Sequence, residues 1–422
     1  MPGSIVAEFA SRGLIHDSTD RTELDARCAR EPLAAYVGFD PTADSLHVGH
    51  LLGQVSLRRL QLLGHRPIVL AGGATGMIGD PSGRSEERNL LDAGALESNV
   101  ASISSQLERL LDFAPGPTGA LLVNNAHWTA GSDLIAFLRD VGKHVTVNQM
   151  LAKDSVRSRL DGGSGLSYTE FSYMLLQAND FRHLCEHHGC ELQLGGSDQW
   201  GNITVGIDLV RKVLGRTAHG LTWPLVTKSD GTKFGKTASG AVWLSAERTS
   251  VYQFHQFWMN LADDDVESLM PWFSLAPSAE VGATVEAHRA DPGARSAQRA
   301  LAREMTALVH GGAAARSAED AAAVLFGGDP YSAGSEIFEM LAAEIPTARI
   351  SSAGDPMEIL SSCGIATSNS EVRRLVAQRG LRVNGRVMEE PAELLAVPRI
   401  HGRWLLLRKG KGSYALLDVR ES

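Results

Sequence analysis

Two histidines lie close together at the expected start of a helix, in the segment 47–50, HVGH. A strand is predicted to end at residues 39–40, and Asp44 or Ser45 is expected to cap the helix that follows. A helix start presents unpaired N–H groups and a partial positive charge, a glycine permits close approach of a ligand, and imidazoles donate hydrogen bonds to phosphate oxygens. The segment therefore indicates a nucleotide site, although two capping or surface histidines would produce the same pattern.

A second phosphate-binding candidate is the segment 227–237, TKSDGTKFGKT, in which Lys233 and Lys236 stand three positions apart among flexible residues. The segment nearly matches a Walker P-loop, but that motif requires glycine in place of Asp230 and follows a first strand. A mobile lid fits the pattern better, because two ammonium groups on a loop can close over a leaving pyrophosphate. A solvated surface turn is the plainer alternative from composition alone.

The elements that must position these segments begin with a strand, a helix and a second strand between residues 34 and 79. The second strand, residues 68–71, is apolar at every position, as is typical of a parallel strand covered on both faces. Further apolar runs at 120–123 and 192–194 alternate with helical stretches. We therefore predict an α/β fold with an open parallel sheet, and the histidines would lie at the carboxyl ends of its strands, where ligands bind.

Composition and charge divide the chain of 422 residues into three predicted domains. Residues 1–240 form the α/β domain, residues 241–330 read as Ala-rich and Glu-rich helix, and residues 350–422 contain short strands around a basic helix. The stretch 327–335, GGDPYSAGS, has the chemistry of a linker. Residues 349–421 hold 12 Lys plus Arg against 8 Asp plus Glu, a net charge of +4, whereas the chain total of -9 leaves -13 for the rest. Any RNA contact should therefore lie at the C-terminal end.

The four cysteines are too few and too scattered for a disulfide framework, which points to a reducing compartment. The N-terminus lacks the cationic start and apolar core of a signal peptide, and no apolar stretch reaches membrane-spanning length. We expect a soluble, cytoplasmic protein that does not associate with membranes.

Residues 183–190, HLCEHHGC, place three histidines and two cysteines within eight positions. Closed zinc sites normally draw pairs of ligands from two separated segments, and His183 with His187 is simply an i, i+4 pair on a helix predicted to end at Gly189. We therefore expect no metal bound tightly by protein ligands.

The two signatures together resemble the HIGH and KMSKS motifs of class I aminoacyl-tRNA synthetases, and the wider match is to the bacterial tyrosyl-tRNA synthetases. Both lysines of the second motif remain, while Phe234, Gly235 and Thr237 replace Met, Ser and Ser. Six segments spread from Tyr36 to Thr237 carry the resemblance: YVGFDPTADSLHVGH, GGATGMIGDPSGR, FLRDVGKH, YTEFSYMLLQANDF, QLGGSDQWGNI and PLVTKSDGTKFGKT. It implies a Rossmann-like catalytic domain, an α-helical domain on the anticodon side and a small α+β RNA-binding domain.

The reaction that this resemblance implies has two steps. The carboxylate of L-tyrosine attacks the α-phosphate of ATP, with Mg²⁺ assisting, and the tyrosyl group of the adenylate then passes to the 3′ end of tRNA(Tyr). Because a carboxylate is ionised at neutral pH, the rate must come from orientation and electrostatics rather than from a general base. The resemblance assigns the phosphates to His47, His50, Thr42, Lys233 and Lys236, and ATP also to Asp40, Gly49, Gly196, Asp198 and Thr237, with Arg84 and Arg88 on a second basic segment.

Substrate choice is assigned to a different set of residues. By resemblance, Asp80, Tyr173 and Gln177 hold the tyrosine ammonium, Tyr36 and Asp180 bind its phenolic hydroxyl, and Gln199 lies near the ribose and the amino acid with Gly196 and Asp198. The spacing of positions 173, 177 and 180 puts those side chains on one side of a helix, where hydrogen-bonded core residues are the alternative. Phenylalanine would leave the buried hydroxyl-binding groups unpaired, so no editing domain is required.

The C-terminal segment 368–388 pairs a capped basic helix with a strand that turns at Asn384-Gly385, and it resembles an RNA-binding module named after a small-subunit ribosomal protein. A solvated helix is the alternative. The cations expected to contact tRNA are Arg373, Arg374, Arg379, Lys409 and Lys411. The family is dimeric near helix 133–143, whose Leu134, Phe137, Leu138 and Val141 have core spacing, so this helix is either buried in the monomer or part of a homodimer interface.

Three other functions are compatible with parts of the pattern. A nucleotidyltransferase that adenylates a small metabolite would need no late helical domain or basic tail, and this chain has both. An RNA-binding regulator with an inactive nucleotide site would be favoured if the histidines or the loop lysines were missing. Tryptophan is the nearest rival substrate for a ligase, and Tyr36 with Asp180 argues against it.

Overall fold

The computed structural model describes residues 2–82, 92–162, 165–229, 231–232, 234–237, 240–410 and 412–420. The chain forms two compact units, one of Met1–Thr249 with Trp258–Leu301 and the other of Ser250–Phe257 with Ala302–Ser422. No helix within these described ranges combines the length and the apolar character needed to cross a bilayer.

The first unit contains the predicted parallel sheet, in the order β3-β2-β1-β4-β5. Its strands are β1 (Ala34–Phe39), β2 (Arg66–Ala71), β3 (Leu121–Asn124), β4 (Cys190–Gly196) and β5 (His219–Trp223). The strand order reverses between β1 and β4, so the ligand crevice of such a sheet is expected beyond the carboxyl ends of these two strands. The predicted α/β fold class is confirmed.

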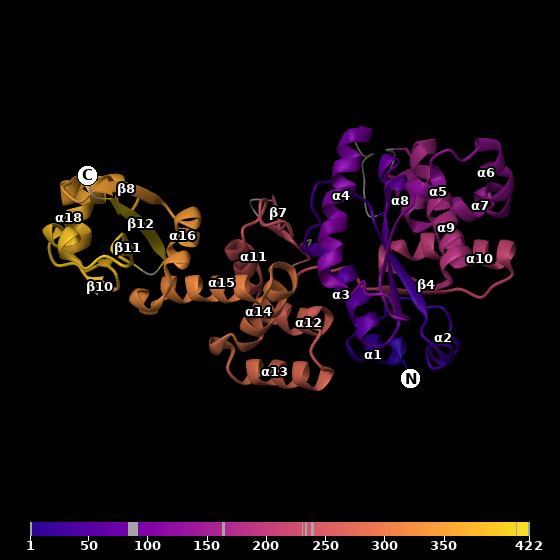
Figure 1. Cartoon of the computed structure of the whole chain (residues 1–422), viewed down its shortest axis with the longest axis horizontal. Helices are drawn as coiled ribbons and strands as arrows, with labels where there is room; N and C mark the ends of the chain where they lie inside the picture. The colour runs from indigo at the N-terminus through magenta and orange to yellow at the C-terminus, as the bar shows by residue number, and fades with distance from the viewer. Residues whose placement is uncertain are drawn as a thin grey trace. The chain divides into compact units, whose positions relative to one another are not determined.

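Helices cover both faces of this sheet. Its crossovers run in opposite directions from the centre, which places α3 and α4 on one side and α9 and α10 on the other (Figure 1). Helix α9 begins at the cap Ser167, whose hydroxyl accepts from the Glu170 N–H, and ends as predicted at Gly189 with φ 62°. The α-helices that precede β5 in the chain are α1 (Ile5–Ser11), α2 (Arg21–Cys28), α3 (Val48–Leu62), α4 (Ala93–Leu110), α5 (Ala126–Thr129), α6 (Leu134–Asp140), α7 (Val147–Leu151), α8 (Asp154–Asp161), α9 (Tyr168–His188) and α10 (Trp200–Leu214).

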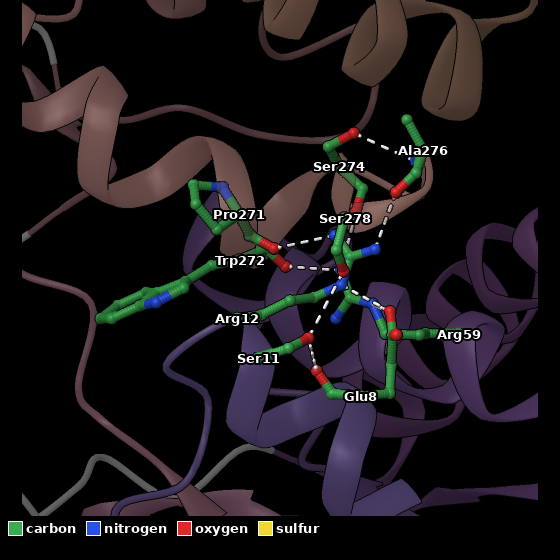
Figure 2. A network of polar contacts seen from close by, with 9 residues as sticks. All are labelled: Glu8, Ser11, Arg12, Arg59, Pro271, Trp272, Ser274, Ala276 and Ser278. Atoms are coloured by element: carbon green, nitrogen blue, oxygen red, sulfur yellow. Dashed lines mark hydrogen bonds and ion pairs between the residues drawn. The ribbon is translucent and has the colours of Figure 1, made fainter. Parts of the chain in front are cut away.

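A helical stretch follows, as the Ala-rich composition predicted: α11 (Val251–Met259), α12 (Asp263–Phe273), α13 (Ser278–Ala290) and α14 (Ser296–His310). The C-terminal end of α12 is tied to the sheet domain by two buried arginines, Arg12 and Arg59, which share the carboxylate of Glu8 (Figure 2). Their guanidinium groups donate to the carbonyls of Pro271, Trp272, Ser274 and Ala276. The last carbonyls of a helix lack intrahelical partners, so these cations satisfy them and favour one position of α12.

The second unit ends in a mixed sheet of order β10-β9-β11-β12-β8. Its strands are β8 (Thr347–Ser351), β9 (Leu381–Val383), β10 (Arg386–Val387), β11 (Trp404–Lys409) and β12 (Ser413–Arg420), and its helices are α15 (Gly312–Leu325), α16 (Ser335–Glu344), α17 (Pro356–Ser362) and α18 (Asn369–Ala377). The predicted turn at Asn384 and Gly385 is present, with φ values of 46° and 81°. Among the described strands of this sheet, β8 and β12 pair in parallel while the other pairs are antiparallel, and β8 lies at one edge.

The stretch 327–335 is packed rather than extended as a free linker. Pro330 is buried, and the Tyr331 hydroxyl donates to the carbonyl of Pro398 at 2.6 Å. Leu325 before it and Phe338 after it share one apolar cluster with Trp404. Glycine and serine gave this stretch its linker composition, but its proline and tyrosine supply the contacts that hold it.

Candidate active site

The HVGH segment forms the first turn of α3, and His47 is itself the N-cap. Its Nδ1 atom accepts a hydrogen bond from the Gly49 N–H at 3.0 Å, and the His47 N–H donates to Nδ1 of His50 at 3.3 Å. The prediction that Asp44 or Ser45 caps this helix is wrong. Both side chains have other partners. Asp44 forms an ion pair with Arg248 at 2.9 Å, and the buried Ser45 hydroxyl donates to the Leu46 carbonyl.

The same hydrogen bonds fix the tautomers of the two imidazoles. A ring nitrogen that accepts a hydrogen bond carries no proton, so the proton of each neutral ring is on Nε2. The rings of His47 and His50 stack with centroids 3.9 Å apart. Burial lowers the pKa of His47, and the charge of Lys236 acts in the same direction. A neutral His47 with a proton on Nε2 suits donation to a phosphate oxygen.

The lysine segment folds directly against the histidine segment. The Val48 N–H donates to the Val242 carbonyl at 3.0 Å, and the Val242 N–H donates to the Gly235 carbonyl at 2.9 Å. Gly235 has φ 80° and no room for a side chain, because a Cβ atom would lie 2.5 Å from Val48 Cγ2. Lys236 follows in a hairpin of β6 (Lys236–Thr237) and β7 (Gly240–Ala241). Two segments far apart in the sequence thus meet at the start of α3.

Phe234, which stands where the family motif has methionine, fastens this loop to the helices behind it. Its buried ring lies 5.7 Å from the ring of Trp258 and 5.5 Å from that of Phe273, measured between centroids. The N–H of Ser229 donates to the Asp265 carboxylate at 2.7 Å. Phe273 and Asp265 both belong to α12, so α12 supports the lysine loop at two points.

Asp40, at the end of β1, receives hydrogen bonds on both carboxylate oxygens. The Tyr173 hydroxyl donates to one at 2.9 Å, and the Thr75 hydroxyl donates to the other at 2.8 Å. The pKa of Tyr173 is raised well above its ordinary value, first by burial and then by the charges of Asp40 and Asp80. The hydroxyl therefore stays protonated and acts as a donor to Asp40.

A second carboxylate, Asp80, is also buried and accepts from the side-chain amide of Gln199 at 2.7 Å. Gln177 joins the same group, because its amide donates to Gln199 at 3.3 Å and its carbonyl accepts from Asn202 at 3.0 Å. Burial raises the pKa of Asp198, and the nearby charge of Asp80 raises it further. We call Asp40, Asp80 and Asp198 the acidic cluster; its accumulated negative charge favours a cationic ligand group.

Tyr36 and Asp180 lie at the other end of the polar side chains and are both fully buried. Among the described residues, the Tyr36 hydroxyl has no hydrogen-bond partner. Asp180 accepts from the Asn125 amide at 2.9 Å and from the Trp128 indole N–H at 2.8 Å. Burial raises the pKa of Asp180 to about 7 even though both donors oppose the shift. Buried polar groups of this kind normally find partners, so an unpaired hydroxyl indicates a place for a ligand atom.

Some of the other predicted residues lie on α9, some lie next to Asp40 and Asp198, and some lie outside the described part of the chain. Tyr173, Gln177 and Asp180 turn to the same group of polar side chains, as their spacing on α9 predicted. Thr42 is exposed beside Asp40, and a Cβ atom at Gly196 would lie 2.7 Å from an Asp198 carboxylate oxygen, so a side chain there would displace that carboxylate. The predicted residues that lie outside the described part of the chain are Lys233, Lys411, Arg84, Arg88 and the side chain of Thr237.

Comparisons with known proteins decide the family. Residues 29–327 match the family model "tRNA synthetases class I (W and Y)", and residues 336–417 match the tyrosine–tRNA ligase SYY-like C-terminal domain. The chain is 50% identical to the tyrosine–tRNA ligases of Anaeromyxobacter dehalogenans and Opitutus terrae, with 99% of this chain and 100% of each relative covered. It belongs to the tyrosine–tRNA ligases of this class I family. A C-terminally truncated mitochondrial tyrosyl-tRNA synthetase of Aspergillus nidulans superposes with a TM-score of 0.70 at 33% identity, covering 76% of this chain and 94% of that one.

The described residues of the candidate site in this tyrosine–tRNA ligase include hydrogen-bond donors and carboxylates. Three residues of the site were missed by sequence reasoning: Thr75, Asn125 and Trp128. Asn125 and Trp128 follow the carboxyl end of β3, and this position in a parallel sheet was the signal that could have found them. Asn125 also donates to Thr75 at 3.0 Å, which links Asp180 to Asp40 through Asn125 and Thr75.

The predicted tRNA-binding side chains that the structure describes in the C-terminal unit of this ligase reach the surface, and some have acidic partners. Arg373 and Arg374 of α18 are exposed, and Arg374 lies 3.8 Å from Glu371. Lys409 pairs with the same Glu371 at 2.7 Å. Arg379 pairs with a glutamate and is 70% exposed. In the described part of the chain, no three His, Cys, Asp or Glu side chains are grouped so as to hold a metal ion.

Proposed function

We propose that the enzyme works as a tyrosine–tRNA ligase through a tyrosyl-adenylate formed at the carboxyl ends of β1 and β4. The observation that carries this proposal is the meeting of the HVGH turn and the Lys236 hairpin, in the same domain as the buried, unpaired Tyr36 hydroxyl. The substrates are L-tyrosine, ATP with its Mg²⁺, and tRNA(Tyr). Amino-acid-dependent ATP–pyrophosphate exchange, measured with each of the common amino acids, should respond strongly to tyrosine alone; a stronger response to tryptophan would contradict the proposal.

The phosphates would be bound by donors from both signatures. His47 and His50 offer Nε2 protons at the start of α3, and Lys236 approaches from the hairpin, with Lys233 and Thr42 assigned by family likeness. Positive charge aimed at the departing pyrophosphate lowers the barrier without any proton transfer, because the tyrosine carboxylate is already ionised. Asp40, Gly49, Gly196, Asp198 and Thr237 complete the proposed ATP-binding set.

Tyrosine would be held at both ends. The acidic cluster favours its ammonium group, which Asp80, Tyr173 and Gln177 would bind with Gln199 alongside. At the other end, Tyr36 would donate to the phenolic oxygen, and the phenolic O–H would donate to Asp180. Phenylalanine leaves the Tyr36 hydroxyl without a partner and offers Asp180 no donor beyond Asn125 and Trp128, and a buried group left unpaired costs about 1–3 kcal/mol.

Tyrosine affinity is therefore expected to rise with pH. The pKa of Asp180 without ligand is about 7, so at pH 6 Asp180 is protonated in most molecules of the enzyme. A protonated Asp180 must lose its own proton before it can bind the phenolic O–H as a carboxylate. The dissociation constant for tyrosine should fall about tenfold from pH 6 to pH 8, because deprotonation ceases to oppose binding. Calorimetric titration at several pH values measures this effect.

Two controls isolate Asp180 in that titration. Phenylalanine has no hydroxyl, so its weaker binding should not change over the same pH range. Asp180→Asn removes the titrating group and should abolish the pH dependence for tyrosine. A tyrosine affinity that is equal at pH 6 and pH 8 would contradict the role of Asp180.

We also propose the functional division 1–240 for catalysis, 241–330 on the anticodon side and 350–422 for tRNA binding. The family model for a tyrosine–tRNA ligase C-terminal domain at residues 336–417 supports the last of these. Free, buried thiols at Cys28, Cys185, Cys190 and Cys363 are in keeping with a cytoplasmic, reducing location.

A homodimer is proposed from the exposed apolar face of α6 and α7. Leu134 and Ile135 are 67% and 68% exposed, and Leu138, Val147 and Leu151 are exposed beside them in the chain. Of the four residues with the predicted core spacing, Val141 is buried in an apolar cluster of the monomer and Phe137 packs against that cluster. Exposed apolar side chains grouped in this way mark protein interfaces, and a second copy of the chain is the partner that family likeness favours.

Charged residues on this face should separate the subunits. Leu134→Asp combined with Ile135→Asp is expected to weaken dimerisation by about 100-fold, because each change buries an unpaired charge where an apolar contact stood. Analytical ultracentrifugation across a concentration series measures the shift. Phe326→Asp, at an apolar residue that is 74% exposed elsewhere, is the control and should leave the oligomeric state unchanged. A double variant that stays dimeric would place the interface on another face.

A further inference from the structure

The carboxylate that faces the phenol end of the site is held by a tryptophan on a very short helix. Trp128 lies in the four-residue helix α5, which has no side-chain cap, and its indole is only half-buried. Its Nε1–H nevertheless donates to Asp180 at 2.8 Å. The direction of that N–H follows the plane of the ring, so whatever fixes the ring also fixes the hydrogen bond.

His183 lies flat against this ring. The imidazole and the indole have centroids 4.2 Å apart and planes only 14° apart, which is a stacked arrangement. His183 follows Asp180 by three positions on α9, so the stacking ring and the carboxylate project from the same side of one helix. The indole is therefore held between its hydrogen bond to Asp180 and its stacking contact with His183, and both partners come from α9.

The stacking imidazole is neutral at physiological pH. Burial is the main cause that lowers the pKa of His183 to about 4, and the charges of His187, Arg182 and His188 act in the same direction while Glu186 opposes them. The ring of His187 packs behind it with centroids 4.3 Å apart at 44°. Of the histidines that suggested a metal site in the sequence, His183 thus stacks on Trp128, and His187 contacts His183 from its own turn of the helix in a tilted arrangement.

We infer that His183 is a positioning residue for the discrimination between tyrosine and phenylalanine, acting through the ring plane of Trp128 on Asp180. The inference rests on the proposed role of Asp180 as the acceptor of the phenolic hydroxyl. If the indole turns away, Asp180 loses one of two donors and can rotate from the direction in which it accepts the ligand proton. Phenylalanine offers no such proton, so its turnover should not depend on the ring.

The test compares His183→Ala with His183→Phe in the full-length enzyme. ATP–pyrophosphate exchange gives kcat and KM for tyrosine and for phenylalanine separately. His183→Ala should lower kcat/KM for tyrosine about fivefold, mainly through a higher KM, and should leave phenylalanine unchanged; fivefold corresponds to about 1 kcal/mol. His183→Phe keeps a flat ring over Trp128 and should retain the discrimination of the unmodified enzyme within about twofold.

His187→Ala is the matched control, because it removes an imidazole one turn further along α9 whose ring contact is with His183 rather than with the indole. It should change the tyrosine-to-phenylalanine ratio by less than about twofold. Three results would overturn the inference. The first is a loss of discrimination in His187→Ala equal to that in His183→Ala. The others, both in His183→Ala, are an equal loss of kcat/KM for the two amino acids and an unchanged tyrosine-to-phenylalanine ratio. Thermal unfolding of each variant separates such losses from a general loss of folded enzyme.

Two more variants distinguish this inference from the function on which it rests. Tyr36→Phe removes the other hydroxyl partner, and Trp128→Phe removes the indole N–H but keeps a ring. If both reduce the discrimination and His183→Ala does not, only the role of His183 fails. If neither reduces it, the assignment of the phenol-binding end itself is at fault.

Discussion

Lys236→Ala is expected to slow adenylate formation by about 10²- to 10³-fold, while the dissociation constant for tyrosine changes less than about twofold. The reason is where the ammonium group lies. Gly235 packs on Val48 at the start of α3, and the pKa of His47 is lowered mainly by burial and in addition by the charge of Lys236. A cation at this position would stabilise the charge that grows on the departing pyrophosphate, whereas the tyrosine side chain is proposed to bind between Tyr36 and Asp180.

The measurement combines pre-steady-state adenylate formation with equilibrium tyrosine binding. Lys228→Ala is the matched control, since Lys228 belongs to the same segment but lies before the turn that contacts α3. It should retain adenylate formation within a few-fold of the unmodified rate. Equal slowing by both substitutions would mean that the loop is merely disturbed, and an equal loss of rate and tyrosine affinity in Lys236→Ala would argue against a role in the transition state.

The elements of the fold that could be predicted from the sequence are those marked by a local pattern of apolar or polar residues. Residues 68–71 are apolar without interruption, and a buried parallel strand is the element that such a short run favours; the structure has β2 there. The helical spacing of Tyr173, Gln177 and Asp180 likewise required only the geometry of a helix. Periodicity is a local property, so local sequence was sufficient to predict these elements.

The start of α3 shows where local reasoning fails. Aspartate and serine are stronger N-caps than histidine, so Asp44 and Ser45 were the expected caps. Tertiary partners changed the outcome, because Arg248 pairs with Asp44 and the Gln106 amide donates to the Ser45 hydroxyl. Their availability could not be read from the segment alone, and His47 caps the helix instead.

Asn125 and Trp128 were missed for a related reason. Each orients Asp180 from more than 50 positions away in sequence, across the gap between β3 and α9. No motif marks them, and an asparagine or a tryptophan after a strand is common in loops. Only the strand order, with β3 at one edge and β4 beyond β1, brings the segment after β3 to the middle of α9.

The second large effect is expected in the C-terminal unit. Arg373→Glu combined with Arg374→Glu should lower kcat/KM for tRNA by about 100-fold and leave ATP–pyrophosphate exchange within about twofold of the unmodified enzyme. Both side chains are exposed on α18, and each reversal replaces a cation that can bind phosphate by an anion that repels it, at about 1.5–3 kcal/mol for each charged hydrogen bond. Every described residue assigned to the adenylate site belongs to the first unit, so that site should be unaffected.

Point reversals test this division better than deletion of residues 351–422. Deletion would remove β12 and leave β8 without its parallel partner, so a loss of activity could reflect an unfolded remnant. Arg21→Glu combined with Arg30→Glu is the control, since it makes the same change in net charge at exposed positions of the first unit and should not affect aminoacylation. Because binding through phosphate contacts weakens with salt, the α18 variant should also show a shallower dependence of the tRNA KM on ionic strength. Equal losses in exchange and aminoacylation would show that the two units do not divide the reaction in this way.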